Sequence, residues 1–346
     1  MAAVYPGAHN VFIRDHDASN KMVVDFARNV KKFAVNRYVQ VVPVEKVGGY
    51  YLRMTVEEAG RILNDQLEDV HWPDAAPAPE GNEGTETHEW FPYRTIRRAF
   101  PFLLGDLTIE QASWNILAQH SSIQSRRAMT ARTQLAINTL TTQANYATGH
   151  YSAVSSISGN TGTWAQSTTA RQDIKRSLHY AAEKILDDTL AGVEIDDLIL
   201  VVSSGLASKM SLCQEIVDYI KGSPDALAQV RGELPGENTM YGLPNKIYGF
   251  PIVVEKTRKT TTKKGATTSK SSILSDSTAF MVARPGGLVG VADAPNFSTC
   301  VVFAQEEMTV ETLRDAPNRR TMGRVVENIA VEMVAPTSGF LFTSAS

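Results

Sequence analysis

Cysteine is nearly absent from this chain of 346 residues. Only Cys213 and Cys300 occur, without the spacing of a metal or redox motif, and each lies in an apolar run. We expect two buried free thiols in a reducing compartment. With 43% hydrophobic and 21% charged residues, the composition supports a sizeable core without disulfides or metals as staples. The length allows two domains or one large elaborated domain.

Long hydrophobic runs and targeting signals are lacking as well. No window approaches the roughly 18–20 apolar residues of a membrane span. The N-terminal residues 1–17 lack the charged and apolar regions of a signal peptide. We therefore expect synthesis and folding in the cytoplasm and no membrane partner. Neither positive nor negative residues are in large excess. The formal net charge is −3, so global charge does not predict nucleic-acid binding.

Motifs of enzyme chemistry are missing too. The chain has no P-loop, no dinucleotide-binding glycine pattern, no H-E-x-x-H, no C-x-x-C and no nucleophile elbow. Its seven histidines are scattered without metal-ligand spacing. His120 is a candidate general base, but a packed or capping histidine is the simpler interpretation. We predict no catalytic, cofactor or metal site, and a protein that is not an enzyme.

The N-terminal part of the chain is a series of unlike segments. Residues 1–36 are light in apolar patterning and predict an arm that docks on something else, with a helix at 20–32. The β-formers of 37–54, interrupted by two glycines, predict a β-hairpin. A capping box then predicts a short helix over 55–63.

Residues 64–89 contain eight Asp and Glu residues and no Lys or Arg. Their Pro- and Gly-rich middle predicts a long extended loop, which in a compact protein is functional or disordered. The carboxylates lack the glycine-fixed turn of a calcium loop, so a solvated flap is favoured over a cation site. An aromatic strand follows at 90–104 and carries Arg94, Arg97 and Arg98.

The longest helix signal of the N-terminal half begins at a capping box at Thr108 and continues to about Gln143 without a proline. Arg126, Arg127 and Arg132 make the middle of this helix basic. Two interpretations stay open for these arginines: they face DNA phosphates, or they pair with acidic residues of a neighbour.

A Ser/Thr/Gly-rich connector at 152–168 marks the best internal boundary of the chain. A strongly amphipathic helix follows at 169–191. The block from 197 to 304 mixes short strands with helices and contains a basic, threonine-rich loop at 256–270. That loop has no aromatic residue for base stacking, so nucleic-acid contact and a solvated hairpin tip both stay open.

The chain ends in a long predicted β-hairpin, with strands at 308–313 and 324–334 and a turn at 315–322, and a last strand at 340–343.

In this order, the segments resemble the major capsid proteins of tailed double-stranded-DNA bacteriophages, whose fold is the Hong Kong ninety-seven type. The acidic loop, aromatic strand and long helix are similar to that family's extended loop and spine helix. Residues 240–254, MYGLPNKIYGFPIVV, are similar to a glycine-proline run of its axial (A) domain. Residues 307–336 resemble its peripheral (P) domain hairpin.

The resemblance implies an α+β fold in five parts. They are an N-terminal arm (1–36), a β-hairpin with the extended loop (37–106), a spine helix (107–150), an axial domain (151–296), and a P-domain hairpin with the C-terminus (297–346). It also implies a structural protein that assembles with itself as hexamers and pentamers into an icosahedral shell around double-stranded DNA. We expect it in the virion, and in the host cytoplasm during assembly, with scaffolding, portal and decoration proteins as further partners.

Contacts between copies are expected at the acidic loop, the arginine strand and the hairpin tip. The candidate residues are Glu80, Glu83, Glu86, Arg94, Arg97, Arg98, Asn318, Arg319 and Arg320. The candidates to face DNA are Arg126, Arg127 and Arg132.

Two departures from the family pattern matter. Some members join a lysine of the extended loop to an asparagine of the tip, but residues 64–89 contain no lysine, so we predict no such crosslink to Asn318. The arm is short, so we expect either that any scaffold is a separate protein or that the chain has already been processed. Rival interpretations are an encapsulin-like compartment that packages enzymes, another virion component, and an α/β enzyme with an unrecognised site.

Overall fold

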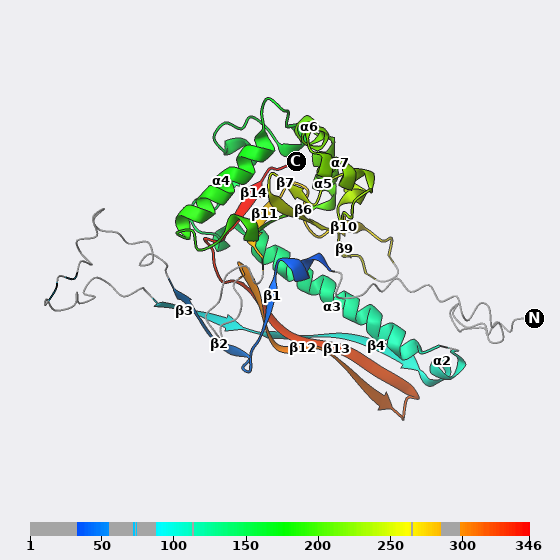
Figure 1. The fold of residues 1–346 in the computed structure, drawn as a ribbon. Coiled ribbons are helices and arrows are strands. Elements are labelled where there is room, and N and C mark those ends of the chain that lie inside the picture. The colour runs from blue at the N-terminus through cyan, green and yellow to red at the C-terminus, as the bar shows by residue number, and fades with distance from the viewer. Residues whose placement is uncertain are drawn as a thin grey trace, which may run out of the picture.

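The structure, a computed structural model, describes residues 33–54, 72, 74, 88–112, 114–263, 266–284 and 298–346. The predicted helices at 20–32 and 55–63 and the candidates Glu80, Glu83 and Glu86 lie outside these residues. Figure 1 shows a rounded upper lobe joined to an elongated lower part, with one long helix running along their junction. Helices and strands occur together throughout, as expected for the α+β class.

A four-stranded sheet forms the lower part, in the order β1-β12-β13-β4. Its strands are β1 (Gln40–Pro43), β12 (Cys300–Asp315), β13 (Arg320–Met333) and β4 (Ile96–Gly105). The antiparallel pair of β12 and β13 confirms the predicted C-terminal hairpin, which is longer than its sequence pattern indicated. Alternate residues of β4 are buried, as expected for a strand with one covered face.

Helix α3 (Ile116–Thr141) covers that face. Phe100 of β4, Ala128 of α3 and Val325 of β13 pack together at its middle. The predicted single helix from Thr108 is wrong at its start, because a separate helix α2 (Asp106–Gln111) comes first. Helix α3 is capped instead by Asn115, whose side chain accepts a hydrogen bond from the backbone N–H of Ala118 at 3.0 Å.

A two-stranded sheet of β2 (Gly48–Met54) and β3 (His88–Arg94) extends from the lower part. The predicted hairpin over 37–54 is therefore wrong: β1 pairs in parallel with β12, whereas β2 pairs with β3. The predicted strand at 90–104 is divided at Thr95, whose N–H and hydroxyl both donate to the carbonyl oxygen of Val47.

The upper lobe is built on a six-stranded sheet, in the order β5-β14-β11-β6-β8-β7. Its strands are β5 (Tyr151–Ala153), β14 (Gly339–Thr343), β11 (Ala279–Ala283), β6 (Leu198–Ser203), β8 (Phe250–Glu255) and β7 (Lys246–Ile247). The last strand of the chain, grouped above with the hairpin at 297–346, therefore belongs to this sheet. It lies between β5, with which it pairs in parallel, and β11.

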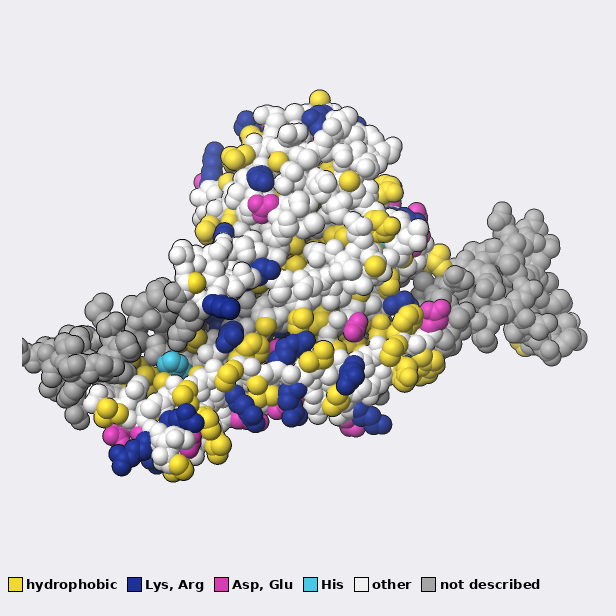
Figure 2. Space-filling model, turned by 180° about the vertical axis from the view of Figure 1, so that it is seen from behind, with side chains coloured by type: hydrophobic (Ala, Val, Ile, Leu, Met, Phe, Trp, Pro, Cys, Tyr) yellow, Lys and Arg dark blue, Asp and Glu magenta, His cyan; other side chains and the backbone are white. Residues whose placement is uncertain are grey.

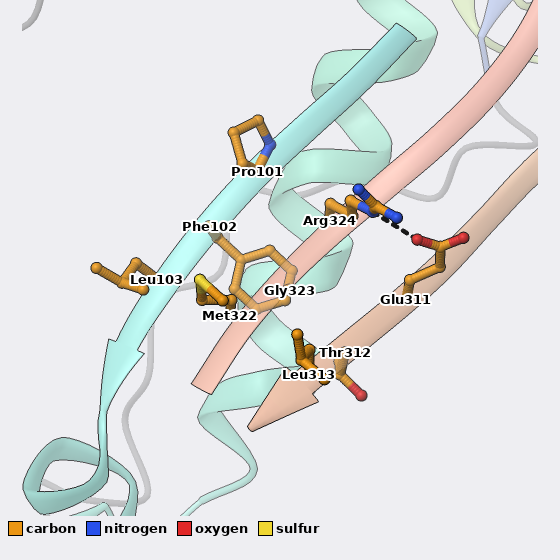
Figure 3. Close-up of a pocket in the computed structure, with 9 residues that line it drawn as sticks. All are labelled: Pro101, Phe102, Leu103, Glu311, Thr312, Leu313, Met322, Gly323 and Arg324. Carbon is orange, nitrogen blue, oxygen red and sulfur yellow. Dashed lines mark hydrogen bonds and ion pairs between the residues drawn. The ribbon is translucent and has the colours of Figure 1, made fainter. Parts of the chain in front are cut away.

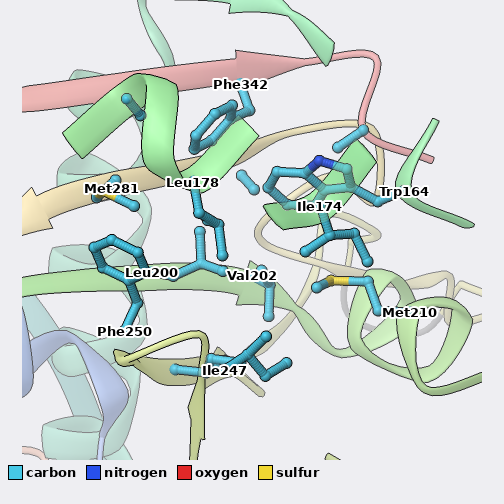
Figure 4. Packing of buried hydrophobic residues seen from close by; sticks show 14 of the residues in the cluster. Trp164, Ile174, Leu178, Leu200, Val202, Met210, Ile247, Phe250, Met281 and Phe342 are labelled. Carbon is cyan, nitrogen blue, oxygen red and sulfur yellow. The ribbon is translucent and has the colours of Figure 1, made fainter. Parts of the chain in front are cut away.

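Four helices accompany this sheet: α4 (Asp173–Asp188), α5 (Ser204–Leu212), α6 (Gln214–Gly222) and α7 (Pro224–Arg231). Short 3₁₀ turns are η2 (Ala34–Arg37), η5 (Gln143–Asn145), η6 (Val154–Ser156), η7 (Trp164–Gln166), η8 (Ile195–Asp197) and η9 (Thr239–Tyr241). Figure 4 shows the core of this lobe, where Trp164 packs near Ile174 and Phe342. The segment 152–168 is thus not a free connector, because Trp164 is fully buried and donates from its indole nitrogen to Ser177.

A second apolar cluster joins the two parts of the molecule. Met129 and Leu140 of α3 pack in it with Val201 of β6, Phe280 of β11 and Val302 of β12. Since a buried large apolar side chain contributes roughly 1.5–3 kcal/mol, this shared core fixes the lobe to the lower part. Both cysteines are free and buried, as predicted.

Candidate assembly surfaces

The turn between β12 and β13 is an exposed and internally bonded corner. Asp315 Oδ2 accepts hydrogen bonds from Asn318 Nδ2 at 2.8 Å and from Arg320 Nε at 2.7 Å. These two bonds, the one from Asn318 first, lower the pKa of the Asp315 carboxyl. The carbonyl oxygen of Arg319 accepts from the N–H of Asp106 at 3.0 Å, which ties the turn to α2. The turn therefore presents the exposed Asn318 and Arg319 side chains in a defined position.

An apolar groove of about 640 Å³ crosses β4, β13 and β12 close to this turn (Figure 3). Its lining residues are Pro101, Phe102, Leu103, Glu311, Thr312, Leu313, Met322, Gly323 and Arg324. The register places Met322 between Leu103 and Leu313, in one row across the three strands. Leu103 is 55% exposed and Leu313 is 65% exposed. Because a soluble monomer seldom exposes a contiguous apolar patch without a use, this face is a candidate for contact with another molecule.

Gly323 follows Met322 on β13 and lies in close contact with β4. Phe102 is its partner on β4, and the phenyl ring lies so close that a Cβ at position 323 would fall 2.1 Å from it. The ring occupies the space that any side chain would need.

A second exposed apolar surface lies on the β2–β3 ribbon. Tyr50 of β2 is 68% exposed and Trp90 of β3 is 65% exposed. The base of the ribbon is anchored, because the rings of Tyr51 and Tyr93 stack on Phe303 of β12 with centroids 5.6 and 4.5 Å apart. In Figure 1 the ribbon and the β12–β13 turn lie at opposite ends of the lower part. Each copy therefore carries one apolar surface toward each end.

The three arginines of the predicted aromatic strand differ in their exposure. Arg94 and Arg97 are exposed, and Arg97 lies 3.8 Å from Glu306. Arg98 is half-buried, and its guanidinium donates to the carbonyl oxygens of Ile96 and Ile329, each at 3.3 Å. Figure 2 shows that basic side chains are scattered among hydrophobic ones along the elongated lower part.

The three helix arginines also differ. Arg127 is exposed and its guanidinium lies 5.6 Å from the ring centroid of Phe100, and Arg126 is half-buried. Arg132 does not face outward, which corrects the prediction that it faces DNA. It is buried and lies 3.2 Å from Glu327 of β13, whose side chain is fully buried. The sequence could not indicate this partner, because the two residues are 195 positions apart.

His120 packs rather than points into a polar site. Its ring is stacked near Phe102 at a centroid distance of 6.0 Å, and burial lowers its pKa. Among the residues that the structure describes, no group of three or more His, Cys, Asp and Glu side chains is placed to hold a metal ion. Within the same residues, no helix has the length and apolar character needed to cross a membrane.

Sequence reasoning missed the buried carboxylate of Glu215 in the upper lobe. Its oxygens accept from the N–H groups of Ile174 and Lys175 at 3.1 and 3.0 Å, and from the hydroxyls of Ser167 and Tyr248. The carboxylate of Glu215, on α6, thus caps the first turn of α4. No local pattern signals a cap that comes from a different helix.

No family model and no curated protein matches this sequence. Solved structures do match. A phage-related protein from Bordetella bronchiseptica RB50 is similar at 14% identity over 95% of each chain, with a TM-score of 0.59. The mature capsid of bacteriophage PhiM1 is similar at 13% identity over 99% of this chain and 91% of that one, with a TM-score of 0.52. The capsid of Cyanophage P-SCSP1u is similar at 12% identity over 88% and 86%, with a TM-score of 0.52. At these identities the likeness shows the fold: the chain has the Hong Kong ninety-seven type fold of phage capsid subunits.

Proposed function

We propose that this chain is the major capsid protein of a tailed double-stranded-DNA bacteriophage. Copies of it assemble as hexamers and pentamers into an icosahedral shell that encloses the DNA. The observation that carries the proposal is the likeness to the PhiM1 capsid, which extends over 99% of this chain. A likeness of that extent includes the elongated lower part, which a compact enzyme domain has no need of.

The exposed apolar surfaces support this proposal on physical grounds. The groove beside Leu103 and Leu313 and the β2–β3 ribbon with Tyr50 and Trp90 lie on different parts of the molecule. Contacts between unlike surfaces of identical copies are heterologous, and they close into rings when the rotation allows it. Obligate interfaces of this kind bury roughly 2,000–5,000 Å², and an elongated subunit provides such area more readily than a sphere.

The test of the proposal is microscopy of the purified full-length chain. We expect closed particles with icosahedral symmetry, whose maps show copy number and contacts together. Monomers under every solution condition would contradict the proposal and favour the enzyme alternative. Particles isolated from producing cells with protein cargo and no DNA would contradict the phage assignment and favour an encapsulin-like compartment.

Charge is the second element of the proposed assembly. We infer that the acidic segment 64–89 reaches over basic surface of a neighbouring copy, because it holds eight acidic residues and no basic one. The variant Glu80→Lys/Glu83→Lys/Glu86→Lys is expected to assemble poorly or to lose the wild-type response to salt.

A matched control reverses three exposed glutamates of the upper lobe, Glu183, Glu194 and Glu233. It makes the same change in net charge away from the acidic segment. Light scattering during assembly at several salt concentrations compares the two. If both variants assemble like the wild type, the acidic segment does not make this contact.

A further inference from the structure

The hairpin of β9 (Arg258–Thr260) and β10 (Lys270–Ser272) has a composition unlike any other described element. Residues 256–272 contain six Lys and Arg residues, nine Ser and Thr residues, and no Asp or Glu. The sequence left the role of this segment open. The structure adds that its ends pair in antiparallel register, which places Arg258, Lys259 and Lys270 on paired strands.

The register sorts these side chains between the two faces of the ribbon. Arg258 lies opposite Ser272, and Thr260 lies opposite Lys270. Because directly opposed residues project to the same side, these four side chains share one face. Arg258 and Lys270 are both exposed there, and so is Thr260, which lies across from Lys270, whereas the Ser272 hydroxyl is buried.

The other face of the ribbon is turned toward helix α3. Lys259 Nζ donates a hydrogen bond to Gln134 Oε1 at 2.7 Å. This contact fixes the ribbon against the helix, so the face with Arg258 and Lys270 is the one left open.

The cations of this ribbon form no ion pair with any carboxylate of the described residues. Arg258 lies 3.5 Å from the hydroxyl of Ser204, and Lys256 Nζ lies 5.4 Å from the ring centroid of Tyr241, both neutral groups. Asp276, in the loop that follows, accepts from Ser203 and lies 4.0 Å from Lys209 instead.

We propose that the open face of the β9–β10 ribbon binds the phosphate backbone of double-stranded nucleic acid without reading its sequence. The inference rests on the proposed shell function and names a surface through which the subunit contacts its contents. Lys, Arg, Ser and Thr side chains are the usual donors to phosphate oxygens. Exposed cations without a carboxylate partner, with the Thr260 hydroxyl on the same face, match that chemistry. The segment has no aromatic residue on which a base could stack, so backbone contact is the mode it offers.

The test uses the full-length chain, kept dilute and unassembled, and two short DNA duplexes of unrelated sequence. The variant Arg258→Gln/Lys263→Gln/Lys270→Gln removes three exposed charges from the ribbon. The control Lys46→Gln/Lys221→Gln/Lys246→Gln removes three exposed charges elsewhere. Fluorescence anisotropy across a salt series gives affinity and salt slope, and microscopy follows shell formation by the same proteins.

We expect the wild type and the control to bind both duplexes equally, with affinity that falls as salt rises. The ribbon variant is expected to bind at least about tenfold more weakly. Its slope of log K against log salt should be shallower by about 2–3, since each phosphate contact contributes about 0.9. All three proteins should form shells.

Two results would overturn the inference. If the ribbon variant binds both duplexes like the wild type, the ribbon does not contact DNA. If its DNA binding is unchanged but shells no longer form, the ribbon instead binds the acidic segment 64–89 of another copy. Failure of the wild type to form shells is a separate result, which counts against the proposed function whatever the binding data show.

Discussion

The buried ion pair between α3 and β13 allows the sharpest test of how this fold is held together. The Arg132 side chain is 9% exposed and that of Glu327 is fully buried, with their charged groups 3.2 Å apart. Burial raises the pKa of the Glu327 carboxyl, although Arg132 opposes the shift. Arg132 Nε and Glu327 Oε1 find no further hydrogen-bond partner within the described residues. The pair is thus imperfectly satisfied.

We expect the single replacements to lower the free energy of unfolding much more than the double replacement does. Glu327→Gln leaves a buried guanidinium without its counter-charge, and breaking a buried pair in this way costs about 3–5 kcal/mol. Arg132→Met leaves the buried carboxylate and should cost a similar amount. The double replacement Arg132→Met/Glu327→Leu removes both desolvated charges, so it should lie within about 1–2 kcal/mol of the wild type.

Urea unfolding of the unassembled chain measures these differences as shifts in midpoint at constant slope. A total stability of roughly 5–15 kcal/mol makes a loss of 3–5 kcal/mol readily visible. The double-mutant cycle then gives the coupling between the two side chains. If both single replacements cost less than about 1 kcal/mol and the coupling is near zero, the pair is open to water and the reasoning fails.

Two further perturbations test particular contacts. Gly323→Ala should destabilise the four-stranded sheet by about 1–3 kcal/mol, because its methyl group would meet the phenyl ring on β4. Gly222→Ala, at the end of α6 where nothing lies within 4 Å of the new Cβ, should be neutral or slightly stabilising. Asp188 tests pH dependence: burial alone would raise its pKa, but hydrogen bonds from Lys184 and His150 outweigh burial and lower it. A lowered pKa means stability that is present above the unfolded value and lost as pH falls through the folded one, so Asp188→Asn should flatten the acid side of a stability–pH profile.

Local signals in the sequence were sufficient where structure is local. The hairpin of β12 and β13 was predictable because alternating apolar residues flank a polar turn, all within one stretch of chain. Helix α4 was predictable because its apolar residues recur at helical spacing over the observed Asp173–Asp188. The buried strand β6, near the start of the block where short strands were expected, is a continuous apolar run.

Pairing across long separations was not predictable in the same way. Strands β1 and β2 are close in sequence and rich in β-formers, yet their partners are β12 and β3. Nothing in either run encodes which distant strand will cover it, because strand pairing depends on packing and register with the partner. The same limit applies to Arg132, whose helix position is visible in the sequence and whose buried counter-charge on β13 is not.

The exposure of the candidate contact residues was predictable for kinds of surface more than for individual side chains. The hairpin turn at Asn318 and Arg319 is exposed, as a polar turn should be. Arg98 bonds to backbone carbonyls of its own sheet, which a list of charged residues cannot reveal. The apolar groove arises only when β4 lies beside β13, far from it in sequence.

Charge segregation along the chain bears on how copies hold together. The net charge is −3, and setting aside the eight acidic charges of 64–89 leaves +5 on the rest. A subunit divided in this way attracts the unlike part of a neighbour and repels the like part, which favours heterologous contact. Such attraction is screened over roughly 8 Å at physiological salt, whereas apolar contact at the groove is not.

This division predicts a shell without covalent locking. The acidic segment holds no lysine, so it has no amine to join to Asn318 of a neighbour. Particles boiled in detergent and reductant should therefore give one band at the monomer mass of 37.8 kDa. Native particles, in contrast, should weaken in high salt and persist partly through their apolar contacts. A ladder of covalent oligomers on the denaturing gel would contradict this prediction.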